Sequence, residues 1–443
     1  MARAQSLRLP HGTRPDQRSG INRSLRRWLA VEVRRLRPLI LLSAAECHAD
    51  RYRKHFTSFA HALLLLFHGL ARGPSLTQSY QTFGACRSLV ALSELAVSDD
   101  PANEHIAVSF SQFAASNTSR PSDFLAGLVP VLAERVRQLG RQSAQSIPAD
   151  VQILDGTFLH LSLKLATWLP NHDPSDIPGV RLQIQYTPAA DLPTYLLMTD
   201  SHTNDCQALD QLLADASPVL DRWRDQTLVI DLGYYSHRRF ALLLNAGVHL
   251  VTRLQQQATV CVTAERPIQQ PLPALLADRI VLQADQEITL GSANNRTGAV
   301  LPHLRLVTAT VAPLPAAARR GAQSVVYRLI TDRWDLSATE VVQIYLWRWQ
   351  IELFFRWLKR HVHLLRVLGY SRAALDLTVW LSIIVHLLTV LAAHAMGLSR
   401  RTPGLLHRLV WTLAQLSLED ADVTDPPAYQ LAFGESPPLA RSP

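Results

Sequence analysis

The chain has 443 residues, of which 48% are hydrophobic and 18% are charged, so it has enough apolar residues for a large core and for two or three domains. A chain without a folded core is excluded. The net charge of +8 and the pI of about 9.6 favour a polyanionic partner. The four cysteines form no CxxC pair, so we expect neither disulfides nor a zinc site, and we expect a reducing cytoplasm.

The N-terminus carries no signal-peptide pattern, because it is rich in arginine and lacks an early apolar segment. Its first 37 residues hold ten arginines against Asp16 and Glu32. We predict that residues 1–45 form a basic arm, which is either a solvated tail or a segment that lies on nucleic acid. Residues 46–148 have helical spacing, as in FTSFAHALLLLFHGLA, and predict a helical domain.

From residue 150 onward the pattern favours strands. VQILDGTFLHLSLK, VRLQIQYTPA and TYLLMTDSH predict a three-strand meander. TLVIDLGYY (227–235) is a short apolar run typical of a buried parallel strand, and it lies between two predicted helices. Residues 256–324 predict a β-rich insertion. We expect an α/β domain at 149–418, built on a mixed sheet flanked by helices, and a Pro-rich tail at 419–443.

One apolar stretch, residues 377–396, is long enough to cross a bilayer. It contains His386 and His394, and the sequence has no second comparable span. We therefore interpret it as a buried core helix. A membrane protein is the alternative, and solubility without detergent would exclude it.

The stretch YLWRWQIELFFRWLK (345–359) follows SATE (337–340), a capping box that predicts the start of a long helix. At about 100° per residue, a polar stripe roughly 80° wide carries Tyr345, Arg348, Glu352, Arg356 and Lys359. Nearly all other residues are apolar, so we expect protein around most of the helix and a cleft at the stripe. The alternative is a core helix whose ridge satisfies itself, because Arg348 and Arg356 each lie one turn from Glu352.

Two aspartates follow apolar runs: Asp155 follows VQIL and Asp231 follows TLVI. Alone, each is a common strand-end turn residue. With Glu352 they give three carboxylates from three elements of one domain, which repel one another unless cations join them. Carboxylate oxygens suit Mg²⁺, and two such ions can promote phosphodiester cleavage. We expect Asp155, Asp231 and Glu352 to hold two Mg²⁺ ions, with Mn²⁺ as an alternative.

The spacing Tyr345-x2-Arg348-x3-Glu352-x6-Lys359 resembles the YREK motif of the family-four insertion-sequence transposases. These are DDE enzymes with a ribonuclease-H-like catalytic domain. DGT at 155–157 and DLGYY at 231–235 resemble the family's two aspartate boxes. The motif spacing is a specific signal, whereas each aspartate box alone is weak. The resemblance covers roughly residues 150–395, and residues 46–145 resemble the family's DNA-binding portion only loosely.

The resemblance implies a cut-and-paste transposase that cleaves terminal inverted repeats and joins them to target DNA. Asp155, Asp231 and Glu352 would be the catalytic metal ligands. The implied DNA-contacting residues are Tyr345, Arg348, Lys359 and Arg253, and the residues close behind the carboxylates are Thr157 and Tyr234. The resemblance also implies a homodimer assembled on DNA, in a bacterial cytoplasm at the nucleoid, without a membrane.

Two other functions remain open from the sequence. One is a ribonuclease-H-like nuclease that performs no strand transfer. The other is a transposase-derived DNA-binding protein that has lost catalysis, although the presence of all three carboxylates counts against it.

Overall fold

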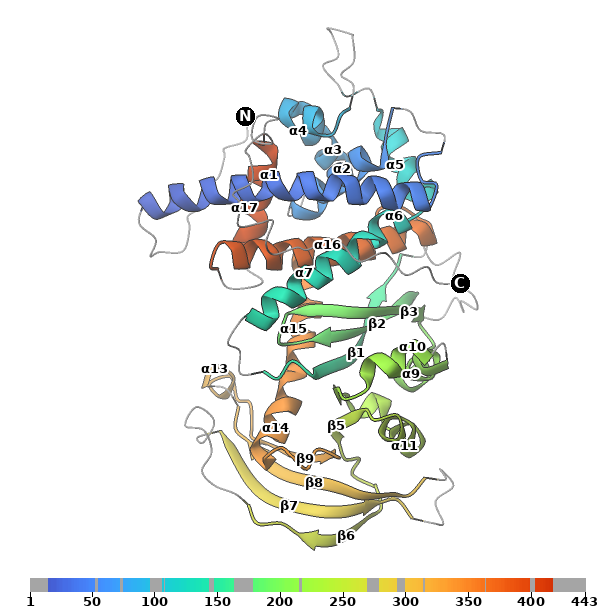
Figure 1. Cartoon of the computed structure of the whole chain (residues 1–443), viewed down its shortest axis with the longest axis vertical. Helices are drawn as coiled ribbons and strands as arrows, with labels where there is room; N and C mark the ends of the chain where they lie inside the picture. The colour runs from blue at the N-terminus through green and yellow to red at the C-terminus, as the bar shows by residue number, and fades with distance from the viewer. Residues whose placement is uncertain are drawn as a thin grey trace. The chain divides into compact units, whose positions relative to one another are not determined.

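The computed structural model describes residues 15–51, 55–71, 75–95, 106, 108–142, 147–162, 178–214, 217–268, 279–292, 299–313, 315–362, 364–398 and 403–416. The chain divides into two compact units (Figure 1). We call Met1–Leu128 with Ala392–Pro443 the helical unit, and Val129–Leu391 the sheet unit. The predicted Pro-rich tail and the first 14 residues of the predicted arm lie outside the described residues.

The described part of the helical unit consists mainly of helices. They are α1 (Pro15–Glu46), α2 (Ser58–Leu70), α3 (Leu76–Ala85), α4 (Arg87–Leu92), α5 (Phe110–Ser119), α6 (Asp123–Ala126) and α17 (Pro403–Ala414). Side chains cap several of these helices: Thr57 accepts from Ala60 N, and Ser109 forms a capping box with Gln112. The buried helix α2 runs through the centre of this unit, since all of its residues are buried.

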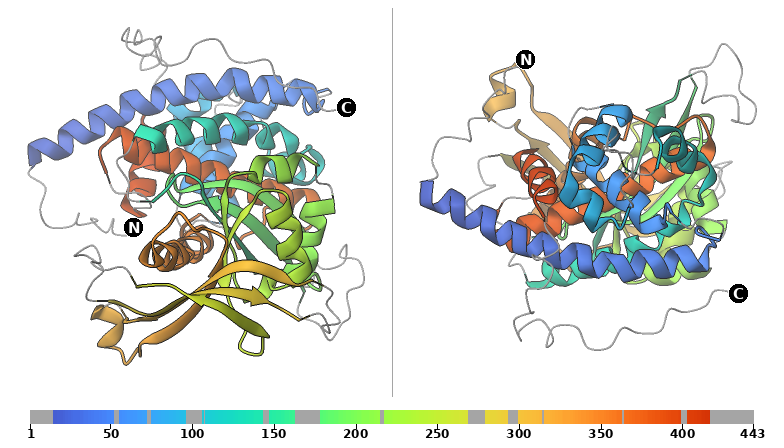
Figure 2. Two further views of the ribbon diagram at one scale, coloured as in Figure 1. Left: turned by 60° about the horizontal axis from the view of Figure 1, so that its bottom comes forward. Right: turned by 90° about the horizontal axis from the view of Figure 1, so that it is seen from above.

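Helix α1 corrects the expectation of a basic arm. It is the long helix at the blue end of the chain in Figures 1 and 2. Leu25, Leu29, Val33, Leu36 and Ile40 recur every three or four residues and are all buried. The charge count hid this apolar stripe, because arginines alternate with it along the chain. The apolar face of α1 from Leu25 onward therefore belongs to the core of the helical unit.

The C-terminal helix α17 also belongs to the helical unit. Leu405, Leu406, Leu409 and Leu413 on α17 are buried, and the Cys86 Sγ donates to the carbonyl of Ala414 over 2.9 Å. The sequence had placed everything from 149 to 418 in one domain. In the structure, residues from Ala392 onward belong to the helical unit instead.

The sheet unit contains one nine-stranded mixed sheet in the order β3-β2-β1-β4-β5-β9-β8-β7-β6. The strands are β1 (Val151–His160), β2 (Gly179–Thr187), β3 (Leu192–Asp200), β4 (Thr227–Val229), β5 (His249–Arg253), β6 (Val260–Glu265), β7 (Ile280–Leu290), β8 (Leu301–Val311) and β9 (Val325–Thr331). The predicted meander is confirmed, because β1, β2 and β3 pair antiparallel in sequence order. The predicted parallel strand is also confirmed, because β4 pairs in parallel with β1 and with β5. The mixed α/β fold class follows.

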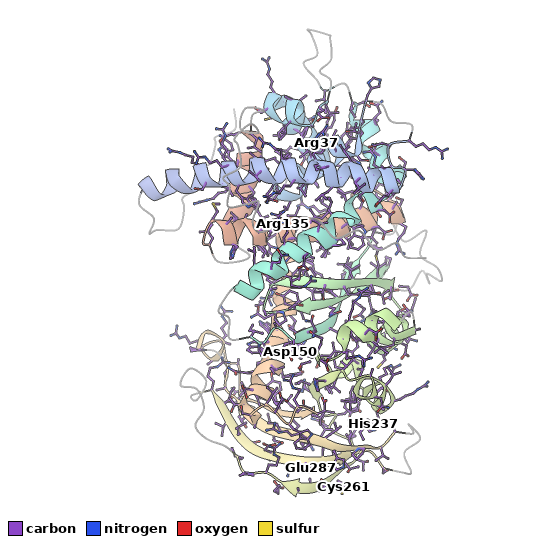
Figure 3. The ribbon with its side chains drawn as sticks, viewed as in Figure 1. Arg37, Arg135, Asp150, His237, Cys261 and Glu287 are labelled. Carbon is purple, nitrogen blue, oxygen red and sulfur yellow. The ribbon has the colours of Figure 1, made fainter. Side chains whose placement is uncertain are left out.

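The strands β6, β7 and β8 form where the sequence predicted a β-rich insertion. They continue the same sheet, because β9 pairs antiparallel with both β5 and β8. Figure 3 labels Cys261 and Glu287 on β6 and β7, the strands at this end of the sheet.

Helices cover both faces of the strands β1–β5. The remaining helices of this unit are α7 (Leu128–Gln142), α9 (Asp205–Ala214), α10 (Ser217–Trp223), the 3₁₀ helix η1 (Leu232–Tyr234), α11 (His237–Asn245), α13 (Pro315–Ala318), α14 (Ala338–Trp347), α15 (Trp349–His361) and α16 (Arg372–Ala395). One apolar core joins Leu154 of β1 to Leu209, Trp223 and Phe240 of α9, α10 and α11. On the other face Phe354 of α15 stacks on Tyr186 of β2 at 5.3 Å.

Helix α16 is the one described helix that is long and apolar enough to cross a membrane, and 89% of its apolar window is buried inside the protein. His386 accounts for part of this burial, because its Nε2 lies 2.9 Å from the carbonyl oxygen of Asp191. Its ring also packs against Phe354 at 4.8 Å. These contacts are those of a core helix, as the sequence predicted.

A buried ion pair fixes the segment that leads into α14. Arg305 of β8 binds both carboxylate oxygens of Asp285 of β7, at 2.8 and 2.7 Å. Its Nη1 donates to the carbonyls of Arg333 and Leu336 at 3.1 and 2.5 Å. Arg333 in turn reaches Asp150, which Figure 3 labels just before β1, over 2.8 Å. The start of α14 is therefore tied to both halves of the sheet.

We expect Arg305→Met to destabilise the sheet unit by about 3–5 kcal/mol, because it leaves the Asp285 carboxylate buried without its partner. The measurement is urea unfolding followed by tryptophan fluorescence. Arg224→Met is the matched control, since Arg224 and its partner Asp221 are both exposed and the expected loss is within about 0.5 kcal/mol. Equal effects of the two substitutions would contradict the structural role given to Arg305.

Candidate active site

The register of two parallel strands brings the two aspartates to one edge of the sheet. Ile153 of β1 pairs with Val229 of β4, and Asp155 and Asp231 each lie two residues further along the chain. The Asp155 Oδ1 accepts a hydrogen bond from the amide of Gly156, and the Asp231 Oδ1 accepts one from the amide of Leu232, both at 2.8 Å. Each carboxylate is thus oriented by the backbone that follows it.

Glu352 comes from a helix that the sequence predicted as continuous and that the structure divides. The capping box is confirmed, because Ser337 caps α14 and Glu340 returns the bond. At Arg348, however, the helix tightens: Arg348 N donates to Tyr345 O, and Ile351 N donates to Arg348 O. These bonds span three residues, so α14 ends and α15 begins there. Tyr345 and Glu352 consequently lie on different helices on either side of Arg348.

The guanidinium of Arg348 contacts all three carboxylates. Its Nη1 lies 3.1 Å from the Asp155 Oδ2, and its Nη2 lies 2.7 Å from the Glu352 Oε1 and 3.8 Å from the Asp231 Oδ2. The hydroxyl of Tyr345 donates to the Asp231 Oδ1 over 3.0 Å. The structure therefore brings together five of the residues singled out in the sequence.

Charge is unbalanced in this group, since three carboxylates share one guanidinium. Burial raises the pKa of Asp155 to about 6, although Arg348 partly opposes this effect. Burial disfavours the charged form of Arg348, but Asp231, Asp155 and Glu352 outweigh it and raise its pKa. Burial, and next the Asp231 charge, raise the pKa of Tyr345. Tyr345 accordingly remains a hydrogen-bond donor at neutral pH.

These side chains line an open cleft of about 470 Å³. The described residues that line it are Asp155, Gly156, Thr157, Asp231, Arg348, Glu352, Phe355, Arg356, Lys359 and Arg360. The Lys359 Nζ donates to the carbonyl of Phe158 over 2.9 Å, and burial lowers its pKa. The Arg356 guanidinium lies 5.7 Å from the centre of the Trp349 ring. The alternative prediction paired Glu352 with both Arg348 and Arg356. Glu352 pairs with Arg348 as predicted, whereas Arg356 lies over Trp349.

Arg253 does not join the described residues that line the cleft. Its guanidinium lies 5.7 Å from the centre of the Tyr327 ring, and Tyr327 packs on Tyr345 at 5.6 Å. It therefore lies one ring beyond Tyr345. Tyr234 is fully buried and lies outside the cleft lining, whereas Thr157 is part of it.

Two lining residues escaped the sequence interpretation. Arg360 lies four residues after Arg356 and eight after Glu352, so helical spacing alone could have added it to the polar stripe. Phe355 is buried and had been assigned to the apolar face only.

The site fits a divalent cation in the type and charge of its donors. Carboxylate oxygens are the ligands that Mg²⁺ prefers, and three of them meet at one cleft. Among the described residues, no group of three His, Cys, Asp or Glu side chains forms a ready metal site, and the Arg348 guanidinium lies among these carboxylates. An ion bound by all three would require that guanidinium to move off them.

The comparisons with known proteins point to one class. The family model described as "Transposase DDE domain" matches residues 147–388. The chain is 27% identical to "Putative transposase y4zB" of Sinorhizobium fredii over 284 residues, covering 63% of this chain and 70% of that protein. It is 22% identical to "Probable transposase for insertion sequence element IS5377" of Geobacillus stearothermophilus over 268 residues, covering 60% of this chain and 63% of that protein.

A solved structure titled "Cryo-EM structure of piggyBac transposase synaptic complex with hairpin DNA (SNHP)" covers 92% of this chain and 83% of its own, with 10% identity and a TM-score of 0.38. The family model spans more than half of the chain and all three site carboxylates. The chain therefore belongs to the family of transposases with a DDE domain.

Proposed function

We propose that this transposase cleaves DNA at the ends of its element and joins the freed ends to target DNA, using two Mg²⁺ ions held by Asp155, Asp231 and Glu352. One observation carries the proposal: a single guanidinium contacts carboxylates from three separate segments, at the wall of an open cleft. Mn²⁺ is expected to substitute for Mg²⁺. When bound there, such ions activate the attacking oxygen and stabilise the leaving oxygen of a phosphodiester.

The chain's own residues divide the remaining work. Arg348 keeps the carboxylates together before DNA arrives, and a DNA phosphate offers it an alternative anionic partner. Lys359, Arg356 and Arg360 bring further positive charge to the cleft wall, where they neutralise the phosphates. Tyr345 donates a hydrogen bond from its hydroxyl to Asp231 and orients that carboxylate. Arg253 acts one layer further out, on the DNA beyond Tyr345.

Two finer features support placing the chain in the family-four insertion-sequence group. Of the four residues with the YREK spacing, Tyr345 and Arg348 contact site carboxylates, Lys359 contacts β1, and Glu352 is itself the third carboxylate. The meander β1–β3 continued by parallel β4 and β5 is the arrangement expected of a ribonuclease-H-like core. We infer both assignments from these features together.

The helical unit is proposed to bind DNA through α1. Arg23, Arg27 and Arg34 are exposed and fall within about 40° on a helical wheel. Arg37, labelled in Figure 3, borders this stripe and pairs with Glu94 at 2.7 Å. A row of arginines along one helix face suits the regular phosphates of a duplex. We further propose that two copies assemble on DNA, in the cytoplasm at the nucleoid.

A nuclease without strand transfer is the second candidate, because the same cleft serves a hydrolytic cut alone. Strand-transfer products from pre-cut ends distinguish the two activities. A non-catalytic DNA-binding protein is the third candidate, and absence of Mg²⁺-dependent nicking would favour it.

Glu352→Gln is expected to lower cleavage by orders of magnitude while binding of the end persists, because it removes a charged metal ligand and keeps the side-chain shape. The measurement is Mg²⁺-dependent nicking of a labelled fragment from the DNA flanking the reading frame, beside a gel shift on the same fragment. Glu340→Gln is the control, since Glu340 only caps α14. An active Glu352→Gln protein would remove Glu352 from the metal site.

Stabilisation by Mg²⁺ is expected to grow as pH rises through about 6. Burial raises the pKa of Asp155 from 3.8 to about 6, so between these values the native state binds more protons than the unfolded state. The contribution of Asp155 to stability without metal therefore falls as pH rises through that window. Metal binding needs the deprotonated carboxylate, so the Mg²⁺-induced rise in Tm should be small at pH 5 and full above about pH 7.

Asp155→Asn provides the control for this pH series, because its amide does not titrate. The variant should show no step near pH 6 in its response to Mg²⁺. An equal Mg²⁺ effect at pH 5 and pH 8 in the unaltered protein would refute the role given to Asp155.

Replacing Arg27 and Arg34 together by Gln should reduce the log–log salt slope of duplex binding by about 2, since each lost phosphate contact removes about 0.9. Fluorescence anisotropy at several salt concentrations measures this slope. Point substitutions are needed because deleting α1 would also remove buried Leu25 and Trp28. Arg222→Gln with Arg224→Gln is the control, since it removes the same charge from the exposed C-terminal end of α10 and the turn that follows. An unchanged slope in the α1 variant would show that this row of arginines faces solvent and does not contact DNA.

A further inference from the structure

A polar group, two of whose members are fully buried and one half-buried, lies behind the two aspartates and takes no part in the chemistry described above. It consists of Gln183 on β2, Asp205 at the start of α9, and Tyr234 in η1. The hydroxyl of Tyr234 donates to the Gln183 Oε1, and the Gln183 Nε2 donates to the Asp205 Oδ1 over 3.0 Å. Gln183 and Tyr234 are fully buried. These two consecutive hydrogen bonds link three segments that are separate in the sequence.

This group touches the backbone next to each aspartate. Gln183 pairs with Gly156, the residue after Asp155, and a Cβ at Gly156 would lie 2.7 Å from the Gln183 amide. The Asp205 carboxylate packs against Gly233, two residues after Asp231, where a Cβ would overlap it. A side chain at either position would have to displace a side chain of the polar group.

The polar group lies on the face of β1 opposite Asp155. Neighbouring residues of a strand point to opposite faces, so Gly156 shares its face with Leu154, which packs in the core with Tyr234. The group thus contacts the backbone that carries the aspartates without entering the cleft. Its contacts can therefore act on the cleft through the positions of the strand β1 and of the turn 231–234, beside the direct effect of the Asp205 charge on Asp155.

We propose that Gln183, Tyr234 and Asp205 form a brace that sets the separation of Asp155 and Asp231, and so the affinity of the site for divalent cations. The brace rests on the proposed metal function of this site. Its three members are positioning residues, because they bond to one another and none of them lines the cleft. Groups that orient metal ligands without touching the metal commonly alter affinity or activity by 10–100-fold when replaced.

The hydrogen-bond polarity of the brace gives a sharp test. Gln183→Glu replaces the amide donor with a carboxylate that faces Asp205, so two like charges meet. Adding Asp205→Asn restores a donor opposite an acceptor and returns the local charge to its original value. We expect Gln183→Glu to weaken Mn²⁺ binding by about 10–100-fold and the double variant to recover most of it. Free Mn²⁺ is measured by electron paramagnetic resonance during titration of the full chain.

Gln185→Glu separates positioning from general destabilisation. Gln185 lies two residues along the same strand and is also buried, where it bonds Gln152 and Trp223 at 3.1 and 2.8 Å. Its replacement buries a carboxylate in the same way, away from the glycines. It should lower Tm while leaving Mn²⁺ affinity within about twofold. If Gln183→Glu fails to fold, Tyr234→Phe tests the brace instead, because it buries no new charge. Tyr234→Phe should weaken Mn²⁺ binding.

The outcomes are distinguishable from failure of the metal site itself. If Glu352→Gln binds Mn²⁺ as tightly as the unaltered chain, the proposed metal site and the brace both fall. If Glu352→Gln loses Mn²⁺ while Tyr234→Phe and Gln183→Glu retain it, the brace alone falls. The brace is likewise overturned if Gln185→Glu matches Gln183→Glu, or if the double variant recovers nothing.

Discussion

Three carboxylates can share one cleft only when a cation lies among them, and Arg348 supplies that cation in the protein by itself. The other structural features decide whether this contact can form. The parallel register of β1 and β4 delivers two carboxylates to one edge, and the tightened turn between α14 and α15 delivers the guanidinium and the third. The polar network around Arg305 and Arg333 anchors the start of α14 to the strands. A shift of α14 along its axis would separate Arg348 from the aspartates.

Arg348 and a bound metal ion would compete for the same carboxylate oxygens. Its guanidinium bonds the oxygens that a metal would need, so metal binding and release of Arg348 are one exchange. A DNA phosphate favours this exchange by giving the guanidinium another anion. In the proposed function, linkage of this kind would couple DNA and metal: DNA would raise the affinity for metal, and metal would raise the affinity for DNA by the same factor.

Local sequence patterns predicted those parts of the fold that depend on local physics. The meander, the parallel strand at 227–229, the capping box at Ser337 and the apolar core helix at 372–395 all follow from periodicity and capping. The sequence predicted that Asp155, Asp231 and Glu352 meet in one cleft, but it assigned Arg348 to DNA and to Glu352 and did not predict that its guanidinium contacts all three carboxylates. Gln183 left no signal, because its role arises from a pairing with Gly156 across two strands. The apolar face of α1 was missed because ten arginines in the first 37 residues dominated the composition.

The place of α17 in the helical unit has a consequence for synthesis on the ribosome. The sheet unit is one continuous segment, Val129–Leu391, whereas the helical unit needs α17, which is made last. Domains generally fold as units as they emerge, so the catalytic carboxylates can come together while α1 and α2 still lack the surface that α17 buries. A chain shortened before Pro403 would then keep the three site carboxylates in a complete sheet unit and lack part of the helical unit. Assembly of the carboxylates is thus independent of α17, whereas the unit proposed to bind DNA is completed only when α17 has been made.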